Sequence, residues 1–170
     1  MDEEERLAVP RRPGVRARPE VSRDRKIDRD ETLIRTSLAR AIRARDVGSA
    51  RQILRDMARD RSGIVDDPLE RRLKESLAAC TALIPSVKDR AALRRMIRES
   101  LVNSGAAGAI IALQAWAKPR QVTQSLISIG LSDMTCEFVM LEFVDQFSAE
   151  AVGRARRLLA EHEVVPPARK

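Results

Sequence analysis

The sequence predicts an all-α fold, and three observations support this prediction. From residue 31 to residue 165, apolar residues recur at helical spacing, which places them on one face of each segment. Residues that start or end helices divide this region into segments of roughly 11 to 18 residues. No segment alternates apolar and polar residues as a half-buried strand does. We therefore expect one compact domain of seven or eight short helices, spanning residues 31–165.

The first two predicted helices form a hairpin. Apolar residues share one face of the segment 30–46, which begins at a candidate capping residue, Asp30. Ser49 follows the turn at 46–48 and is positioned to cap a second helix, which ends at Gly63. Because the connecting turn is short, we expect the two helices to pack together.

The third and fourth predicted helices have clear starting signals. Asp67 is a capping residue and Pro68 occupies the first helical position, where its missing N–H costs nothing. This third helix is expected to end at Pro85. Ser86 is positioned to cap the fourth helix, and the segment 103–105 ends it.

The carboxy-terminal part of the domain predicts four more helices. The segment 106–117 is apolar on nearly every face, so we expect a short helix buried at the centre of the fold. Pro119 is positioned to begin a sixth helix. Ser132 is expected to cap a seventh helix that continues to Phe147, and Ser148 to cap the last one.

Residues 1–30 predict a disordered charged arm, because they carry nine basic and eight acidic side chains with few large apolar residues. The charges segregate within the arm. Acidic residues fill positions 2–5, and a proline-spaced basic patch follows, formed by Arg11, Arg12, Arg16 and Arg18. When extended, this patch can lie along a phosphate backbone; the alternative is a solvated tail. A short basic tail is expected at 166–170.

The charge of the chain favours an anionic partner. Lys and Arg total 32 against 25 Asp and Glu, a formal net charge of +7, which favours nucleic acid or an acidic membrane. No predicted helix joins a broad apolar face to flanking lysines, so the membrane is the weaker of these. Arginine outnumbers lysine by 27 to 5. This bias indicates either selection for bidentate contacts to phosphate or carboxylate, or the codon usage of a GC-rich genome.

Two arginine stripes are the strongest candidate binding residues. Each stripe repeats at every fourth position, which places its three guanidinium groups on one helix face. The stripes are Arg51, Arg55 and Arg59 on the second predicted helix, and Arg90, Arg94 and Arg98 on the fourth. Like charges at this spacing repel, so a bound polyanion or acidic partner would explain them. The alternative is a solvated face neutralised by acidic residues of other helices.

Aromatic residues supply a second candidate surface. Trp116 is the only tryptophan, and the cations Lys118 and Arg120 follow it, so it can stack on a base or a partner side chain. The alternative is a core tryptophan. A cluster at helical spacing has the same two interpretations, core or dimer interface, and comprises Met134, Phe138, Met140, Phe143 and Phe147. We therefore also expect a homo-oligomer.

The scarcity of reactive side chains predicts that the chain is not an enzyme. It contains one histidine, His162, no tyrosine and two cysteines, Cys80 and Cys136, although these residue types perform most acid–base, nucleophilic and metal chemistry. There is no glycine-rich phosphate loop, histidine pair or Cys-x-x-Cys motif. We expect no metal, no cofactor and no small-molecule substrate.

Cysteine usage and hydropathy predict an intracellular location. Cys80 and Cys136 lie on apolar helix faces without paired spacing, which indicates buried free thiols in a reducing compartment. The amino terminus is acidic, unlike a secretory signal, and no apolar run is long enough to span a bilayer. We expect a soluble cytoplasmic or nuclear protein.

Two functional hypotheses follow. The first is a helical protein that binds nucleic acid, RNA in particular, without reading its sequence, through the basic patch and the two arginine stripes. The second is an adaptor or scaffold that binds an acidic or amphipathic segment of a partner protein.

Overall fold

The computed structural model describes residues 20–62 and 65–166, and the side chains of 31–60 and 65–166. Within these ranges the chain is all-α, with no strand, as the sequence predicted. The α-helices are α1 (Glu20–Arg43), α2 (Val47–Ser62), α3 (Pro68–Leu83), α4 (Val87–Ala117), α5 (Val122–Ser128), α6 (Cys136–Glu142) and α7 (Ala149–Glu161). Three short 3-10 helices accompany them: η1 (Lys118–Arg120), η2 (Ser132–Met134) and η3 (Val144–Gln146).

Three of the predicted caps are confirmed. The Asp67 carboxylate accepts a hydrogen bond of 2.9 Å from the N–H of Leu69 at the start of α3. The Ser86 and Ser148 hydroxyls accept hydrogen bonds of 3.2 Å in the first turns of α4 and α7. Each bond satisfies an N–H group that has no partner inside its helix.

Ser49 does not cap α2, as the sequence had predicted. The helix begins at Val47, and the Asp46 carboxylate accepts hydrogen bonds from both the N–H and the hydroxyl of Ser49, at 3.0 and 2.6 Å. The hydrogen bond from the Ser49 hydroxyl lowers the pKa of the Asp46 carboxyl. A carboxylate at this position also interacts favourably with the helix dipole, so aspartate takes the role expected of the serine.

Helix α1 begins at Glu20, within the segment 1–30 that the sequence predicts as an arm. Positions 1–19 and 167–170, with the basic patch and most of the basic tail, lie outside the described residues.

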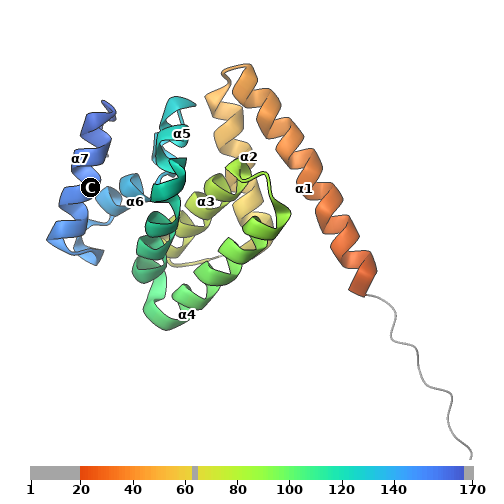
Figure 1. Ribbon diagram of the computed structural model, residues 1–170, viewed down its shortest axis with the longest axis horizontal. Coiled ribbons are helices and arrows are strands. Elements are labelled where there is room, and N and C mark those ends of the chain that lie inside the picture. Colours follow the sequence, from red (N-terminus) through yellow and green to blue (C-terminus); the bar gives the residue numbers. More distant parts are fainter. Residues whose placement is uncertain (1–19, 63–64, 167–170) are drawn as a thin grey trace, which may run out of the picture.

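Gly105 divides α4 into the two helices that the sequence predicted. Its backbone angles are φ 66° and ψ −174°, a conformation that is accessible almost only to glycine. Helical residues lie on both sides of it, and Figure 1 shows that α4 changes direction sharply in its middle. The second half contains Ala109, Ile110 and Leu113, which are fully buried. The predicted helix is therefore confirmed, but it is not buried on all sides as expected, because Ile111 is 46% exposed.

The last predicted helices are more broken than the sequence indicated. Gln121 adopts a left-handed conformation with φ 53°, so η1 and α5 replace the single helix expected from Pro119. Likewise, η2, α6 and η3 replace the single helix expected from Ser132 to Phe147. The break comes from Thr135, which has extended backbone angles and caps α6 by accepting a hydrogen bond from the Phe138 N–H.

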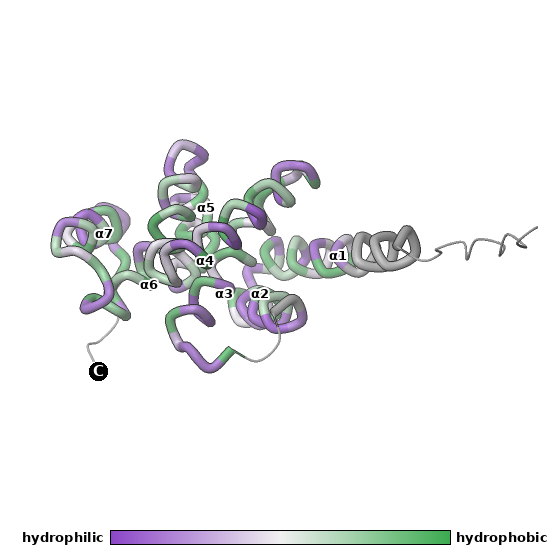
Figure 2. Tube along the Cα trace, turned by 90° about the horizontal axis from the view of Figure 1, so that it is seen from below, coloured by the Kyte–Doolittle hydropathy of each residue, from purple (hydrophilic) through white to green (hydrophobic). Residues whose placement is uncertain are grey.

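Helices α1 to α4 pack in chain order, each against the next, and α6 joins the carboxy-terminal helices to this stack by contacting α3, α4 and α7 (Figure 1). Hydrophobic and hydrophilic residues alternate along the turns of each helix in Figure 2, as expected for helices that each bury one face. The buried residues form one continuous core that extends from α1 to α7. Within the described ranges, no helix has the length and apolar character needed to cross a membrane.

Candidate functional site

The first arginine stripe is paired with carboxylates. Arg51 donates two hydrogen bonds to Asp133 on η2, from Nε at 2.7 Å and from Nη2 at 3.0 Å. Arg55 lies 3.9 Å from the carboxylate of Glu75 on α3, and Arg59 lies 4.0 Å from Asp56 on its own helix. Arg51 and Arg55 therefore join α2 to η2 and α3, whereas Arg59 lies beside an acidic residue of its own helix.

Two residues of the second stripe surround a single carboxylate. Arg90 and Arg94 each lie 3.0 Å from Oε1 of Glu31 on α1. Arg90 is buried and also donates hydrogen bonds to the carbonyl oxygens of Ile84 and Pro85, at 2.9 and 2.8 Å. These contacts fix the start of α4 against α1.

Arg35 adds a third guanidinium to this cluster. Its Nη1 donates a hydrogen bond of 2.7 Å to the Ile84 carbonyl. Burial, together with repulsion from Arg90 and Arg94, lowers the pKa of Arg35, and attraction to Glu31 only partly offsets these effects. Three guanidinium groups and the carboxylate of Glu31 therefore lie close together between α1 and α4.

Arg72, which the sequence did not single out, is the centre of a larger ion-pair network. It pairs with Glu75 on its own helix and with Glu142 on α6, and it donates a hydrogen bond to the Asp133 carbonyl. The Nε atom of Arg72 lies 2.6 Å from Oε2 of Glu142. Hydrogen bonds and attraction from Glu142 and Glu75 raise the pKa of Arg72 against the opposing effect of burial.

The two stripes therefore do not form one continuous face of unpaired cations. Among the six stripe arginines, Arg98 alone is exposed and forms no ion pair with a described side chain. The basic patch at Arg11, Arg12, Arg16 and Arg18 lies outside the described residues. Nucleic-acid binding stays a prediction, and the paired stripes lend it little support.

Arg98 borders an apolar groove formed by α2, α3 and the first half of α4. Helix α3 contacts both α2 and α4, and its residues provide part of the lining. The apolar lining residues are Met57, Ala58, Leu73, Leu77, Ala78, Ile97 and Leu101. Thr81 completes this part of the lining, and its hydroxyl is occupied because it donates to the Ala78 carbonyl. The interior of the groove thus offers hydrophobic contact and no open hydrogen-bonding side chain.

Three cations surround the apolar interior. Lys74 pairs with Glu70 at 2.8 Å, and Arg94 pairs with Glu31. Arg98 completes the rim without an ion pair among the described side chains. A ligand that enters the groove with an apolar group therefore meets positive charge at the edge, and Arg98 is available for a new ion pair.

The size of the groove limits what can bind. Its volume is about 250 Å³, which is below the roughly 300–1,000 Å³ of pockets that enclose drug-sized ligands. It is large enough for one or two apolar side chains. No group of three or more potential metal-ligating side chains occurs in the described part of the chain.

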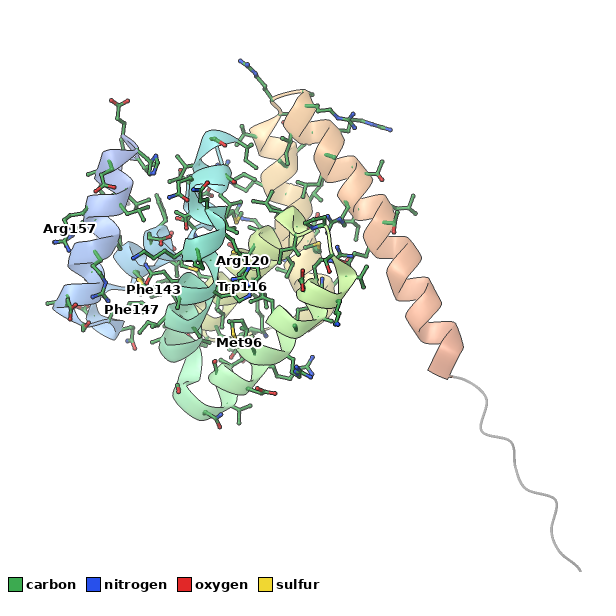
Figure 3. The ribbon with its side chains drawn as sticks, viewed as in Figure 1. Met96, Trp116, Arg120, Phe143, Phe147 and Arg157 are labelled. Carbon is green, nitrogen blue, oxygen red and sulfur yellow. The ribbon has the colours of Figure 1, made fainter. Side chains whose placement is uncertain are left out.

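Trp116 is partly buried and packs against the core. The Arg120 guanidinium lies 4.1 Å from the centre of its ring, and Figure 3 shows the two side by side. Arg120 also donates a hydrogen bond of 2.8 Å to the Trp116 carbonyl. One ring face is therefore covered by a cation of the same chain, while Lys118 is exposed. This arrangement leaves less of the ring for stacking than the sequence had suggested.

The methionine and phenylalanine cluster belongs to the core. Met134 and Met140 are fully buried. Phe138, Phe143 and Phe147 are partly buried against the core, and Figure 3 shows Phe143 and Phe147 near the start of α7. The core interpretation is confirmed for the two methionines, and self-association stays a prediction.

A buried polar cluster joins α4, α5 and α6, and its hydrogen bonds are made within the chain. The Glu137 carboxylate is buried and accepts hydrogen bonds from Gln114 at 3.1 Å and Thr123 at 3.2 Å. Cys80 and Cys136 are free, buried thiols. Burial raises the pKa of Cys80 to about 12 and that of Cys136 well above its ordinary value, and Glu137 contributes to both. Such thiols are poor nucleophiles at neutral pH.

The sequence placed several groove residues on apolar helix faces, but it did not show that these faces line one groove. Leu73 and Leu77 belong to the apolar stripe of the third predicted helix, and Ile97 and Leu101 to that of the fourth. No sequence pattern identified Lys74 as a candidate binding residue. Only the packing of three helices shows that these stripes leave a gap between them, which periodicity within one helix cannot indicate.

No protein-family model, curated protein or solved structure matches the chain. The groove and its basic rim are therefore the basis for a functional proposal.

Proposed function

We propose that this protein is a non-enzymatic adaptor that binds an acidic, amphipathic segment of a partner protein in the groove between α2, α3 and α4. The observation that carries the proposal is the apolar groove with a basic rim, in which Arg98 has no acidic partner among the described side chains. Apolar side chains of the partner segment would fill the interior, and its carboxylates would contact the rim.

The chemistry of the groove favours a peptide over nucleic acid. Binding of single-stranded nucleic acid combines phosphate contacts with stacking of bases on aromatic rings. The groove lining contains no aromatic residue. Burying an apolar side chain contributes about 1.5–3 kcal/mol, and an aliphatic groove provides that contact to leucine, isoleucine or methionine but not to a base.

The pairing of the stripes supports the same conclusion. Arg51, Arg55 and Arg94 contact carboxylates of other helices, so phosphate would have to displace intramolecular ion pairs. An acidic peptide needs fewer changes, because Arg98 is already exposed beside the groove.

Selection from a library of short random peptides displayed on phage tests the proposal. We expect selected peptides to combine leucine, isoleucine or methionine with neighbouring aspartate or glutamate. Replacing Arg98→Glu should weaken binding of a selected peptide about tenfold, because it turns an attractive rim contact into a repulsive one. Leu77→Gln should weaken it similarly by placing a polar group in the groove.

Two variants provide matched controls. Arg95→Glu makes the same charge change on the same helix, at an exposed residue that does not line the groove. Val102→Gln makes an apolar-to-polar change at an exposed position next to Leu101. Both should keep the affinity of the original protein. Equal losses in Arg98→Glu and Arg95→Glu would contradict the proposal.

A mixed-sequence RNA oligonucleotide serves as the competing probe. Three results together would support the nucleic-acid hypothesis instead. The RNA would bind at low salt, its affinity would fall steeply as salt increases, and Arg95→Glu and Arg98→Glu would weaken its binding equally. Selected peptides without acidic residues would also overturn the proposed role of the rim.

A further inference from the structure

We propose that the acidic amino-terminal segment of this chain, residues 2–9, occupies the basic-rimmed groove of the same molecule. The inference rests on the proposed function, because it names an internal occupant of that site. A partner segment would then have to displace residues 2–9, so the amino terminus would set the threshold for binding.

The composition of the segment matches the groove. Asp2 to Glu5 are four consecutive acidic residues, and no other four-residue window of the chain is entirely acidic. After Arg6 come three apolar residues, Leu7, Ala8 and Val9. The segment thus combines the two features that the groove selects, carboxylates for Arg98 and the rim and small aliphatic side chains for an interior of about 250 Å³.

The chain is long enough for this contact. Helix α1 begins at Glu20, and Glu31 on the same helix lies 3.0 Å from Arg94, which lines the groove. Glu31 lies eleven positions after Glu20, which corresponds to about 16 Å along the helix. The ten residues 10–19 span up to about 33 Å when extended. The tether can therefore return residues 2–9 from the start of α1 to the groove.

Tethering makes even weak binding effective. A short flexible tether holds its ligand at an effective concentration of about 1 mM. If the free segment bound with a dissociation constant of about 0.1 mM, the tethered segment would fill the groove about nine-tenths of the time. The apparent affinity of any competing peptide would then fall about tenfold.

The test measures binding of a synthetic peptide with the sequence of residues 1–10, labelled with fluorescein, to full-length proteins by fluorescence anisotropy. The neutralised variant carries Asp2→Asn, Glu3→Gln, Glu4→Gln and Glu5→Gln. A charge-matched control carries Asp145→Asn, Glu150→Gln, Glu161→Gln and Glu163→Gln, which lie outside the groove lining. We expect the peptide to bind the neutralised variant about tenfold more tightly than either the wild type or the control.

The second measurement shows where the peptide binds. Adding Arg98→Glu to the neutralised variant should weaken peptide binding about tenfold, whereas adding Arg95→Glu should not. Equal peptide affinity for the wild type and the neutralised variant would overturn the inference. The inference would also be overturned if the wild type sediments as a dimer and the neutralised variant as a monomer, because residues 2–9 would then bind a second copy of the chain.

A peptide selected by display on the groove separates this inference from the proposed function. If that peptide binds wild type and neutralised variant equally, and loses affinity with Arg98→Glu, the proposed function holds and self-occupancy is wrong. If Arg98→Glu changes the affinity of neither peptide, the proposed function and self-occupancy are both wrong. Tighter binding of the selected peptide to the neutralised variant supports both.

Discussion

Arg51 and Asp133 form a bidentate ion pair across 82 residues of sequence, with Nε to Oδ2 at 2.7 Å and Nη2 to Oδ1 at 3.0 Å. The pair joins α2 to η2, so it links the amino-terminal helices to the carboxy-terminal ones. Bidentate contacts between arginine and carboxylate are stronger than most ion pairs near a surface. Arg51 therefore has a structural role that its position in an exposed-looking stripe did not reveal.

Removing this pair should reduce stability by a small, measurable amount. The side chains are 32% and 22% exposed, so solvent screens the pair and the coupling free energy should be on the order of 1 kcal/mol. A double-mutant cycle of Arg51→Ala and Asp133→Ala, followed by urea unfolding with circular dichroism, measures that coupling.

Arg59 is the control for the pair. It is exposed and lies 4.0 Å from Asp56 on the same helix, so Arg59→Ala should change the free energy of unfolding by less than about 0.5 kcal/mol. A coupling energy near zero for Arg51 and Asp133 would mean that the pair does not hold η2 against α2.

Arg72 should be more important for stability than Arg51 or Arg59. Its side chain is 12% exposed and that of Glu75 is 13% exposed, so Arg72→Leu leaves a nearly buried carboxylate with only Arg55 at 3.9 Å. Such a change should cost about 3 kcal/mol in urea unfolding. Adding Glu75→Gln should recover part of the lost stability, because it removes the unpaired carboxylate. If the double variant is less stable than Arg72→Leu, the desolvation argument is wrong.

The parts of the fold that depend on short-range signals were predictable from the sequence. Asp67, Ser86 and Ser148 cap helices because each side chain reaches an N–H only two or three residues away. Gly105 breaks α4 for an equally local reason, its positive φ. The prediction of Ser49 as a cap was wrong because the carboxylate of Asp46, three residues earlier, accepts a hydrogen bond from the Ser49 N–H.

The candidate site was not predictable, because its properties depend on contacts between distant segments. The sequence predicted one helix face for each arginine stripe, but the partners of Arg51 and Arg94 lie 82 and 63 residues away. Charge counts along the chain cannot show that an arginine already has a carboxylate beside it. The groove is equally non-local, since α2, α3 and α4 each contribute only part of its lining.

Two glycines should respond oppositely to alanine. Gly105→Ala should reduce the free energy of unfolding by about 1–3 kcal/mol, because an L residue is strained at φ 66°, although a Cβ there meets no atom within 4 Å. Gly48→Ala should increase it by about 0.5–1 kcal/mol, because Gly48 lies inside α2 and its added Cβ makes an ordinary 3.6 Å contact with Asp46. Thermal unfolding of both variants tests this. A stabilised Gly105→Ala protein would show that α4 does not need the break.

The two buried cysteines should make the protein less stable in alkali. Burial raises the pKa of Cys80 from an ordinary value of 9.0 to about 12, and that of Cys136 rises as well. The folded protein therefore holds protons that the unfolded chain releases as the pH rises above 9.0. The stability contributed by the protonated thiols is fully present below pH 9.0 and is lost as the pH approaches 12.

Urea unfolding at a series of alkaline pH values measures this loss. We compare the wild type with the double variant Cys80→Ala and Cys136→Ala, in which lysines and all other groups still titrate. The variant will be less stable at neutral pH because smaller side chains leave cavities, so the informative quantity is the slope of stability against pH. That slope should be shallower in the variant between pH 9.0 and 12, since two buried proton-binding groups are gone. Identical slopes would mean that both thiols ionise in the folded protein as readily as in the unfolded chain, and would contradict the expected effect of their burial.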